Sequence, residues 1–165
     1  MVTWIFQGNP KVFQVDKYLA QKKIILWTIR QKHFKDEISI GDEVFIWRAD
    51  GNIPKSGGIV AKGKIISAPQ NLEDDAPDLW IDLQKSTTAL SVAIELEEVR
   101  LTGEGMLKRT DLEKDPNARD MRILKFRSET NYKLEPKHAQ YIEKLWKQKM
   151  NIKWGKVPMN ISLFI

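Results

Sequence analysis

Three side chains with complementary chemistry lie where two apolar segments of the chain end. Asn9 comes shortly after residues 3–6, and Trp27 and Thr28 close residues 24–28. An amide both donates and accepts hydrogen bonds and can pair with the edge of a purine or pyrimidine. An indole stacked on a base contributes roughly 1–3 kcal/mol, and the threonine adds a hydroxyl group. These groups suit one flat, partly polar ligand such as a nucleobase.

Each of these residues also has a purely structural interpretation. Asn9 before Pro10 is typical of the N-cap and first turn of a helix, and Trp27 could fill a core. The chain nevertheless has six tryptophans, and tryptophan is favoured where an apolar ring must also meet a polar partner. Trp27 is our first candidate for stacking. Four other tryptophans are expected in the core, in surface loops or in the basic tail, namely Trp4, Trp80, Trp146 and Trp154.

The sequence offers little for metal or covalent chemistry. It has no cysteine and only two histidines, His33 and His138, which we expect at the surface. A zinc site would then need two or more carboxylates in place of the usual ligands. Neither the GxxxxGK[ST] nor the GxGxxG phosphate-binding pattern occurs, so nucleoside triphosphate hydrolysis is not expected. We therefore predict no metal, no cofactor and no catalytic residue.

A strand, a helix and a second strand must position Asn9, Trp27 and Thr28. Residues 3–6 and 24–28 are apolar runs typical of strands, and the segment between them has the apolar spacing of a helix. This unit is long enough for a parallel crossover, in which both strands end at the same edge of a sheet. We therefore expect residues 7–9 and 28–31 to face one another across a crevice.

The rest of the chain predicts more strands than helices. Residues 43–48 and 57–67 have strand patterns, and we expect them to pair through the loop between them. Further strands are predicted at 79–83 and 92–101, and 121–126 is either a strand or a short helix. The clearest helix is 137–149, whose apolar residues recur on one face. This pattern indicates an α+β fold, a curved sheet or partly closed β-barrel flanked by helices.

Positive charge is concentrated near the C-terminus. The chain carries a net charge of +5, and residues 137–156 hold six lysines against one acid, Glu143. Such a patch can follow a phosphate backbone, and Lys144 and Lys147 are candidates for those contacts. The alternative is a lysine-rich helix face that is merely solvated.

Composition and length set the broader expectations. The 165 residues suit one domain, 1–165, in which a basic helix and tail form residues 137–165. The absence of cysteine favours a reducing compartment, so the cytoplasm is expected, and no apolar run predicts a leader or a membrane span. The apolar residues 161–165 either pack onto the domain or pair with a second copy, so a weak homodimer is one alternative.

Four ordered motifs resemble those of the EVE domain family. They are Trp4-Ile5-Phe6-Gln7-Gly8-Asn9-Pro10, Trp27-Thr28-Ile29-Arg30-Gln31, the run from Ile40 to Arg48, and Gly58-Ile59-Val60-Ala61-Lys62-Gly63. The likeness continues through residues 121–124 and 130–132 and so covers almost the whole chain. The resemblance implies a PUA-like barrel, similar in plan to YTH domains, which hold a methylated adenine between tryptophans. It also implies recognition of modified bases in DNA or RNA, often cytosine derivatives.

The resemblance also assigns residue roles. Asn9, Trp27 and Thr28 match positions where related readers contact the base. Trp47 matches the third-strand motif, where it either lines the pocket or fills the barrel. Arg30 and Gln31 lie beyond a strand end, within expected reach of a phosphate or a base edge, and Asn131 matches as a base contact or a turn residue.

These observations predict a nucleic-acid reader that stacks one modified base on Trp27 and reads its edge with Asn9 and Thr28. The first base expected is a modified cytosine. The family implies a restriction or RNA-modification partner. Two alternatives stay open: a PUA-like amidohydrolase that acts on an acylated nucleoside, and a protein-interaction module recruited through the apolar tail.

Overall fold

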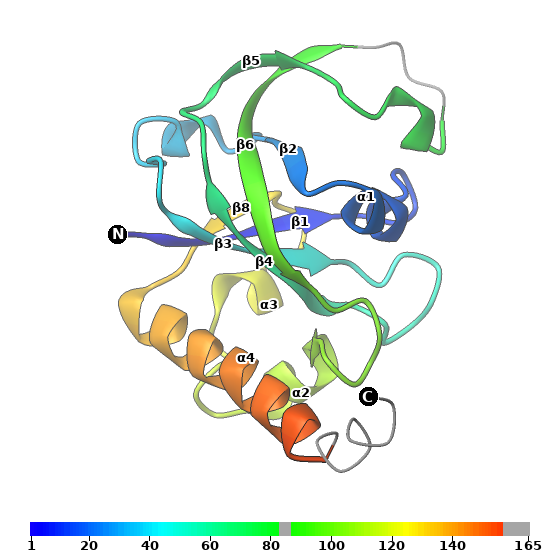
Figure 1. Ribbon diagram of the computed structural model, residues 1–165. Helices are drawn as coiled ribbons and strands as arrows, with labels where there is room; N and C mark the ends of the chain where they lie inside the picture. Colours follow the sequence, from blue (N-terminus) through cyan, green and yellow to red (C-terminus); the bar gives the residue numbers. More distant parts are fainter. Residues whose placement is uncertain (83–86, 157–165) are drawn as a thin grey trace, which may run out of the picture.

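The structure is a computed structural model that describes residues 1–82 and 87–156, with side chains of the last helix described up to Lys149. Within these residues, one mixed sheet curls into a half-barrel flanked by helices (Figure 1). Its strands are β1 (Thr3–Gly8), β2 (Ile24–Thr28), β3 (Glu43–Arg48), β4 (Gly58–Ile65), β5 (Gln70–Glu73), β6 (Thr88–Val99), β7 (Leu107–Lys108) and β8 (Asn131–Lys133). The predicted α+β class with a curved, PUA-like sheet is confirmed.

The strands follow the order β2-β6-β4-β3-β1-β8, with β5 paired to β6 and β7 paired to β4. β1 and β3 are parallel, and the other neighbours are antiparallel. The expected pairing of residues 43–48 with the strand at 57–67 is therefore confirmed.

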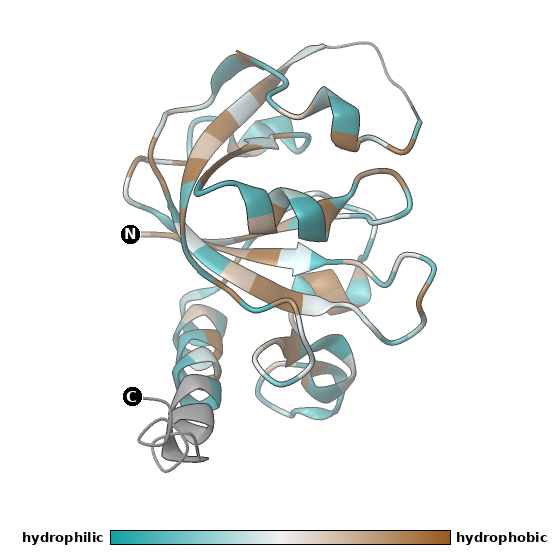
Figure 2. Ribbon diagram, turned by 45° about the vertical axis from the view of Figure 1, so that its right-hand side comes forward, coloured by the Kyte–Doolittle hydropathy of each residue, from teal (hydrophilic) through white to brown (hydrophobic). Residues whose placement is uncertain are grey.

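Helices flank the curled sheet on two sides. α1 (Val15–Gln21) and the 3-10 turn η2 (Pro77–Leu79) lie on one side. α2 (Arg109–Lys114), α3 (Arg122–Lys125) and α4 (Pro136–Lys156) lie on the other, and a further 3-10 turn, η1 (Lys32–Phe34), follows β2 (Figure 1). Figure 2 shows apolar residues running along the strands and hydrophilic residues on the outward turns of the helices. None of the helices in the described ranges is long and apolar enough to cross a membrane.

The central strands are apolar on both faces because each face packs on a separate core. In β1, Trp4 and Phe6 belong to a first core beside α1, whereas Ile5 belongs to a second core beside α2, α3 and α4. β3 alternates in the same way: the first core takes Val44 and Ile46, and the second takes Phe45 and Trp47. Strands covered on both faces appear in a sequence as continuous apolar runs.

Two irregularities in the strand pairing accompany the curl of the sheet. The register of β3 on β4 shifts between Ile46 and Trp47, and that of β4 on β6 shifts between Lys62 and Gly63. Such bulges bend a strand and increase its twist. At Gly63 a Cβ atom would lie 2.5 Å from the Glu95 carbonyl oxygen, so only glycine fits where β4 crosses β6.

The predicted parallel crossover between the first two strands is wrong. β1 lies between β3 and β8, and β2 pairs with β6 at the far end of the path. Burial explains the difference: β1 has three consecutive fully covered residues, whereas β2 alternates between buried and more exposed positions, as expected of an edge strand. The end of β2 nevertheless lies beside β8, the partner of β1, because Asn131 Nδ2 donates to the Thr28 carbonyl oxygen at 3.1 Å, and the Trp27 ring lies against Gly8 at the end of β1.

Candidate functional site

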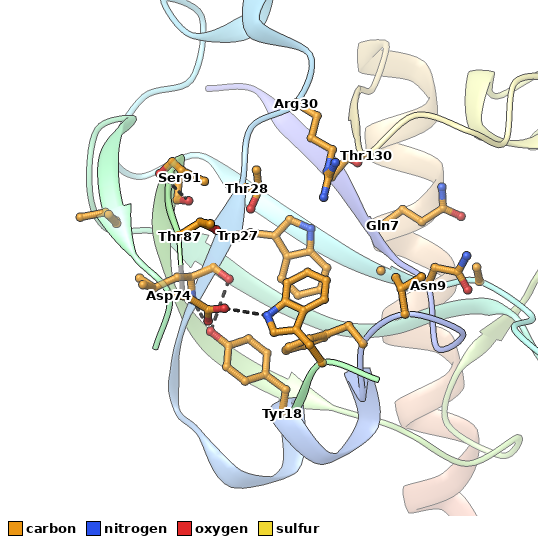
Figure 3. A pocket seen from close by; sticks show the side chains of 18 of the residues that line it. Gln7, Asn9, Tyr18, Trp27, Thr28, Arg30, Asp74, Thr87, Ser91 and Thr130 are labelled. Atoms are coloured by element: carbon orange, nitrogen blue, oxygen red, sulfur yellow. Dashed lines mark hydrogen bonds between the residues drawn. The ribbon is translucent and has the colours of Figure 1, made fainter. Parts of the chain in front are cut away.

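A pocket of about 590 Å³ opens where β1 and β2 end. Its volume lies within the roughly 300–1,000 Å³ usual for small-molecule sites. The wall of the pocket is formed on the side of the sheet that packs on the first core, beside α1. Residues 127–130, which lead into β8, form part of its rim. The lining includes Gln7, Asn9, Tyr18, Trp27, Thr28, Arg30, Asp74, Thr87, Ser91 and Thr130, whose side chains Figure 3 labels around the opening.

Trp27 forms a fixed wall of this pocket. Its side chain is only 7% exposed, yet it lines the cavity. A Cβ atom on Gly8 would lie 3.1 Å from the Trp27 ring and 2.8 Å from the Val15 side chain. The glycine at the end of β1 therefore leaves the space in which the indole lies.

A second indole, that of Trp80, also lines the pocket. Its Nε1 donates a hydrogen bond of 2.6 Å to Asp74 Oδ2, and its ring centroid lies 4.7 Å from that of Phe13. A β-bridge between Phe13 and Trp80 holds this segment beside the turn that precedes α1. The sequence interpretation assigned Trp80 to the core or a surface loop. An available signal was its position just after an acidic, proline-containing stretch, where a large aromatic residue has little core to fill.

The end of the pocket formed by Tyr18, Asp74 and Asp75 is polar, and its side chains are hydrogen-bonded. The Tyr18 hydroxyl donates to Asp75 Oδ1 at 2.7 Å and accepts from the Leu26 backbone N–H at 2.7 Å. Burial raises the pKa of Tyr18 above its ordinary value, so the phenol stays neutral. Lys22 lies 3.2 Å from Asp75 and balances its charge. In the described part of the chain, Asp74 has no such cation, so this end of the pocket is acidic.

Asn9, the amide predicted to contact the base, lies at the rim of the pocket. Asn9 Oδ1 accepts a hydrogen bond of 2.9 Å from the Lys11 backbone N–H, in the turn that leads to α1. Its amide nitrogen has no protein partner within the described ranges. Gln7 is held differently, since its Nε2 donates to the carbonyl oxygens of Arg127 and Glu129 at 2.8 and 2.7 Å. Asn9 therefore keeps an unpaired donor for a ligand, whereas Gln7 fixes the rim.

Gln31 and Asn131 lie outside the pocket lining and hold its walls together. Asn131 Oδ1 accepts from the backbone N–H groups of Arg30 and Gln31, and its Nδ2 donates to the Thr28 carbonyl at 3.1 Å. Gln31 Oε1 accepts in turn from the N–H groups of Thr130 and Asn131. The expectation that these two amides read a base edge is corrected, because their hydrogen bonds fix the backbone of the pocket instead.

Trp47 and the lysines of α4 lie away from the pocket. Trp47 is buried in the second core, because odd-numbered positions of β3 face α2, α3 and α4. Of the two alternatives for Trp47, burial in the core is therefore the one that the structure shows, and the place in the pocket lining is not. Lys144 and Lys147 are exposed on α4, which covers that same side, and Lys147 lies 3.5 Å from Glu143. Arg30, by contrast, is exposed at the pocket itself.

Arg127 adds a second cation to the rim, one that the sequence interpretation missed. It lines the pocket, and its guanidinium lies 2.8 Å from Glu113 on α2. It comes between a short helix and a short strand, where no periodic pattern marks it. Arg30 and Arg127 therefore place positive charge at the opening, opposite the acidic end.

Both histidines were predicted to lie at the surface, and only one of them does. His33 is exposed, but His138 is only 4% exposed, and its Nε2 lies 2.9 Å from Asp120 Oδ1. This contact ties the first turn of α4 to the segment before α3. Among the described residues, no group of three or more His, Asp or Glu side chains is arranged to hold a metal ion. The apolar residues 161–165, on which the homodimer alternative rests, lie outside the described residues.

Comparisons with solved structures find the same fold in several proteins. A hypothetical protein from Leishmania major superposes with a TM-score of 0.63 at 16% identity, over 91% of this chain and 97% of that one. Human THYN1 in complex with 5-methylcytosine-containing DNA gives a TM-score of 0.61 at 14% identity, over 88% and 98%. The DUF55 domain of human thymocyte nuclear protein 1 gives 0.59 at 15% identity, over 87% and 98%. No curated protein sequence matches this chain.

At these identities the solved structures show the fold alone. The sequence itself supplies the family: the model of the EVE domain matches residues 2–145, which include β1, β2 and every strand of the half-barrel. The chain belongs to the EVE domain family.

Proposed function

We propose that this protein is a reader that holds one modified base of DNA in the pocket beside Trp27. The observation that carries the proposal is the pairing of a fixed indole with an unpaired amide donor: Trp27 is 7% exposed and lines the cavity, and the Asn9 amide nitrogen is unpartnered within the described ranges. The solved human relative in complex with 5-methylcytosine-containing DNA supports a modified cytosine as the first base to test.

The proposed complex stacks the base against Trp27, with Trp80 as a second aromatic contact. Stacking on one aromatic side chain contributes roughly 1–3 kcal/mol. The Asn9 amide and the Thr28 hydroxyl then hydrogen-bond to the edge of the base. These directional contacts select the base, whereas the indoles supply affinity that depends little on its identity.

A base inside a duplex must leave the stack to reach such a pocket. Flipping costs a few kcal/mol, and one buried methyl group returns only about 0.8 kcal/mol. We therefore expect modest selectivity for a methyl mark. A polar modification that meets a fixed partner in the pocket should be distinguished more strongly.

Phosphate contacts must add affinity, and we propose Arg30 and Arg127 for this role. Both line the rim, so they lie beside the backbone of a base held in the pocket. Lys144 and Lys147 lie on the helix that covers the opposite side of the sheet. The proposed complex therefore assigns them no contact with the strand whose base is held in the pocket.

We propose that the protein acts by binding, without catalysis, and delivers the modified strand to a partner such as a restriction or RNA-modification enzyme. Incubation with N4-acetylcytidine tests the amidohydrolase alternative. Release of acetate that Tyr18→Phe and Asp74→Asn abolish would contradict a purely binding role.

The test of the proposed function is a titration of oligonucleotides that each carry one modified base. Wild type should bind a 5-methylcytosine or 5-hydroxymethylcytosine strand more tightly than its unmodified counterpart, and Trp80→Ala should weaken binding by about tenfold or more. Ile81→Ala is the matched control, because Ile81 is the exposed neighbour of Trp80 and lies outside the pocket lining. Equal affinity of all three proteins for every strand would refute the proposal.

A further inference from the structure

A loop beside the pocket presents one large apolar side chain to solvent. The loop joins β3 to β4, and Ile53 within it is 67% exposed. Exposing an isoleucine to this extent leaves apolar surface in water that a partner could cover. Its flanking residues Asn52, Pro54 and Lys55 are exposed too, so Ile53 stands at the outer end of the loop.

The loop is held in one shape by hydrogen bonds. Asp50 accepts from the backbone N–H groups of Gly57 and Lys55 at 2.8 and 3.0 Å, and the Ser56 hydroxyl donates to the Ile53 carbonyl at 2.7 Å. Arg109 of α2 pairs with Asp50 at 2.8 Å. These contacts position the backbone on both sides of Ile53 before any ligand binds.

The same loop begins at the pocket and packs on its rim. Ala49 lines the pocket, and its backbone N–H donates to the Gly8 carbonyl at 2.9 Å. A Cβ atom on Gly51 would lie 2.9 Å from the Pro10 Cβ, so the loop touches the turn directly after Asn9. The loop that carries Ile53 therefore adjoins the rim of the pocket at the turn after Asn9.

We infer that Ile53 is a wedge that enters the base stack when the target base leaves a DNA duplex. This inference rests on the proposed function and extends it to double-stranded DNA as the form that is recognised. Proteins that unstack DNA insert an apolar side chain between neighbouring base pairs. An exposed isoleucine in a hydrogen-bonded loop that adjoins the pocket rim meets that requirement. Lys55, two residues further along the loop, and Lys11, next to Pro10, are exposed too and suit contacts with phosphates.

Another exposed apolar residue near the mouth fits the wedge less well. Val12 is part of the pocket lining. A side chain in that place contacts the extruded base itself, so it does not reach the space that the base leaves.

The test compares duplex and single-stranded DNA, because a wedge acts only where a stack must be opened. Wild type, Ile53→Ala and Ile40→Ala are titrated with one sequence that carries a single 5-methylcytosine, as a duplex and as a single strand. Ile40 is the matched control: it is 66% exposed but precedes β3, at the opposite end of the strand from Ile53. Circular dichroism checks that each variant folds.

Ile53→Ala should weaken duplex binding about tenfold and change single-strand binding less than twofold, because it removes apolar contact only in the stack. Ile53→Phe should retain duplex binding, and Ile40→Ala should match wild type on both forms. A 2-aminopurine next to the modified cytosine should brighten on wild-type binding and brighten less with Ile53→Ala.

Three results would overturn the wedge: unchanged duplex binding by Ile53→Ala, an equal loss on both forms, or binding by wild type to the single strand alone. The proposed function would survive each of these results. If wild type shows no preference for 5-methylcytosine or another modified base in either form, the proposed function itself fails, and the wedge fails with it.

Discussion

Gln31 and Asn131 hold each other's backbone through their side-chain amides. Gln31 Oε1 accepts from the Asn131 N–H at 2.8 Å, and Asn131 Oδ1 accepts from the Gln31 N–H at 3.2 Å. Asn131 is 1% exposed and belongs to β8, whereas Gln31 follows β2, so the pair joins the two ends of the strand path. The half-barrel is thus closed by two side chains where no backbone ladder joins its edges.

This closure predicts a large cost for removing either amide. Asn131→Ala should lower the free energy of unfolding by roughly 1–3 kcal/mol, because it leaves partly buried backbone groups at Arg30, Gln31 and Thr28 without their protein partners. Urea denaturation measures the change. The double variant Gln31→Ala/Asn131→Ala should lose less than the sum of the single variants. Strict additivity would show that the two amides do not act as one unit.

Gly8 should be required for the position of the Trp27 indole. Gly8→Ala places a methyl group against the Trp27 ring and the Val15 side chain, so we expect a loss of about 1–3 kcal/mol in stability and weaker base binding. Gly103→Ala is a suitable control, since its new methyl group would meet only the end of the flexible Lys108 side chain. Wild-type stability and affinity in Gly8→Ala would contradict this packing argument.

Asp74 should act by orienting Trp80. Asp74→Ala removes the acceptor of the indole N–H and should weaken binding of a modified strand several-fold. Trp80→Phe keeps an aromatic ring without that donor, so adding Asp74→Ala to Trp80→Phe should have little further effect. A full additional loss in the double variant would mean that Asp74 contacts the ligand directly.

The arginines at the rim should determine the salt dependence of binding. Arg30→Ala should reduce the slope of log affinity against log salt concentration by about one, as expected for one lost phosphate contact. Lys144→Ala should leave that slope nearly unchanged, because Lys144 lies on the helix on the other side of the sheet. The reverse result would place the nucleic-acid backbone along α4.

Asp120 should contribute to stability in a defined acid range. Its hydrogen bonds with His138 and Lys137 lower its pKa from the ordinary 3.8 to about 2. Because the folded pKa is lower, the unfolded chain binds this proton first as the pH falls. The contribution is therefore complete above the ordinary pKa and is lost as the pH falls toward about 2. Melting curves of wild type and Asp120→Asn should converge over that range, and a constant difference would contradict the assignment.

The sequence grouped three residues that share a pocket but mispredicted the strand pairing around them. Asn9, Trp27 and Thr28 line one pocket, as expected, although the parallel pairing used to bring them together does not exist. Strand ends can be recognised locally, since apolar runs stop at polar residues. Which strands become neighbours depends on contacts between distant segments, such as the bonds from Asn131 to residues after β2.

Trp47 and Trp80 show the same limit in opposite directions. β3 is apolar on both faces, so nothing in its alternation tells which face meets the pocket and which meets α4. Trp80 belongs to a segment without periodicity, and contacts with Phe13 and Asp74 hold it at the cavity. The resemblance in motifs identified the family and the first strand ends. It did not distinguish tryptophans that line the pocket from tryptophans that are buried in the core.

The most direct test of the pocket is the affinity of Trp27→Ala for DNA with a single modified cytosine, measured beside wild type by fluorescence anisotropy. Circular dichroism must first show that the variant is folded at the temperature used. We expect wild type to prefer the modified strand over the unmodified one, and the folded variant to lose that preference together with about tenfold or more in affinity. Equal affinity of the two folded proteins for modified DNA would contradict the account.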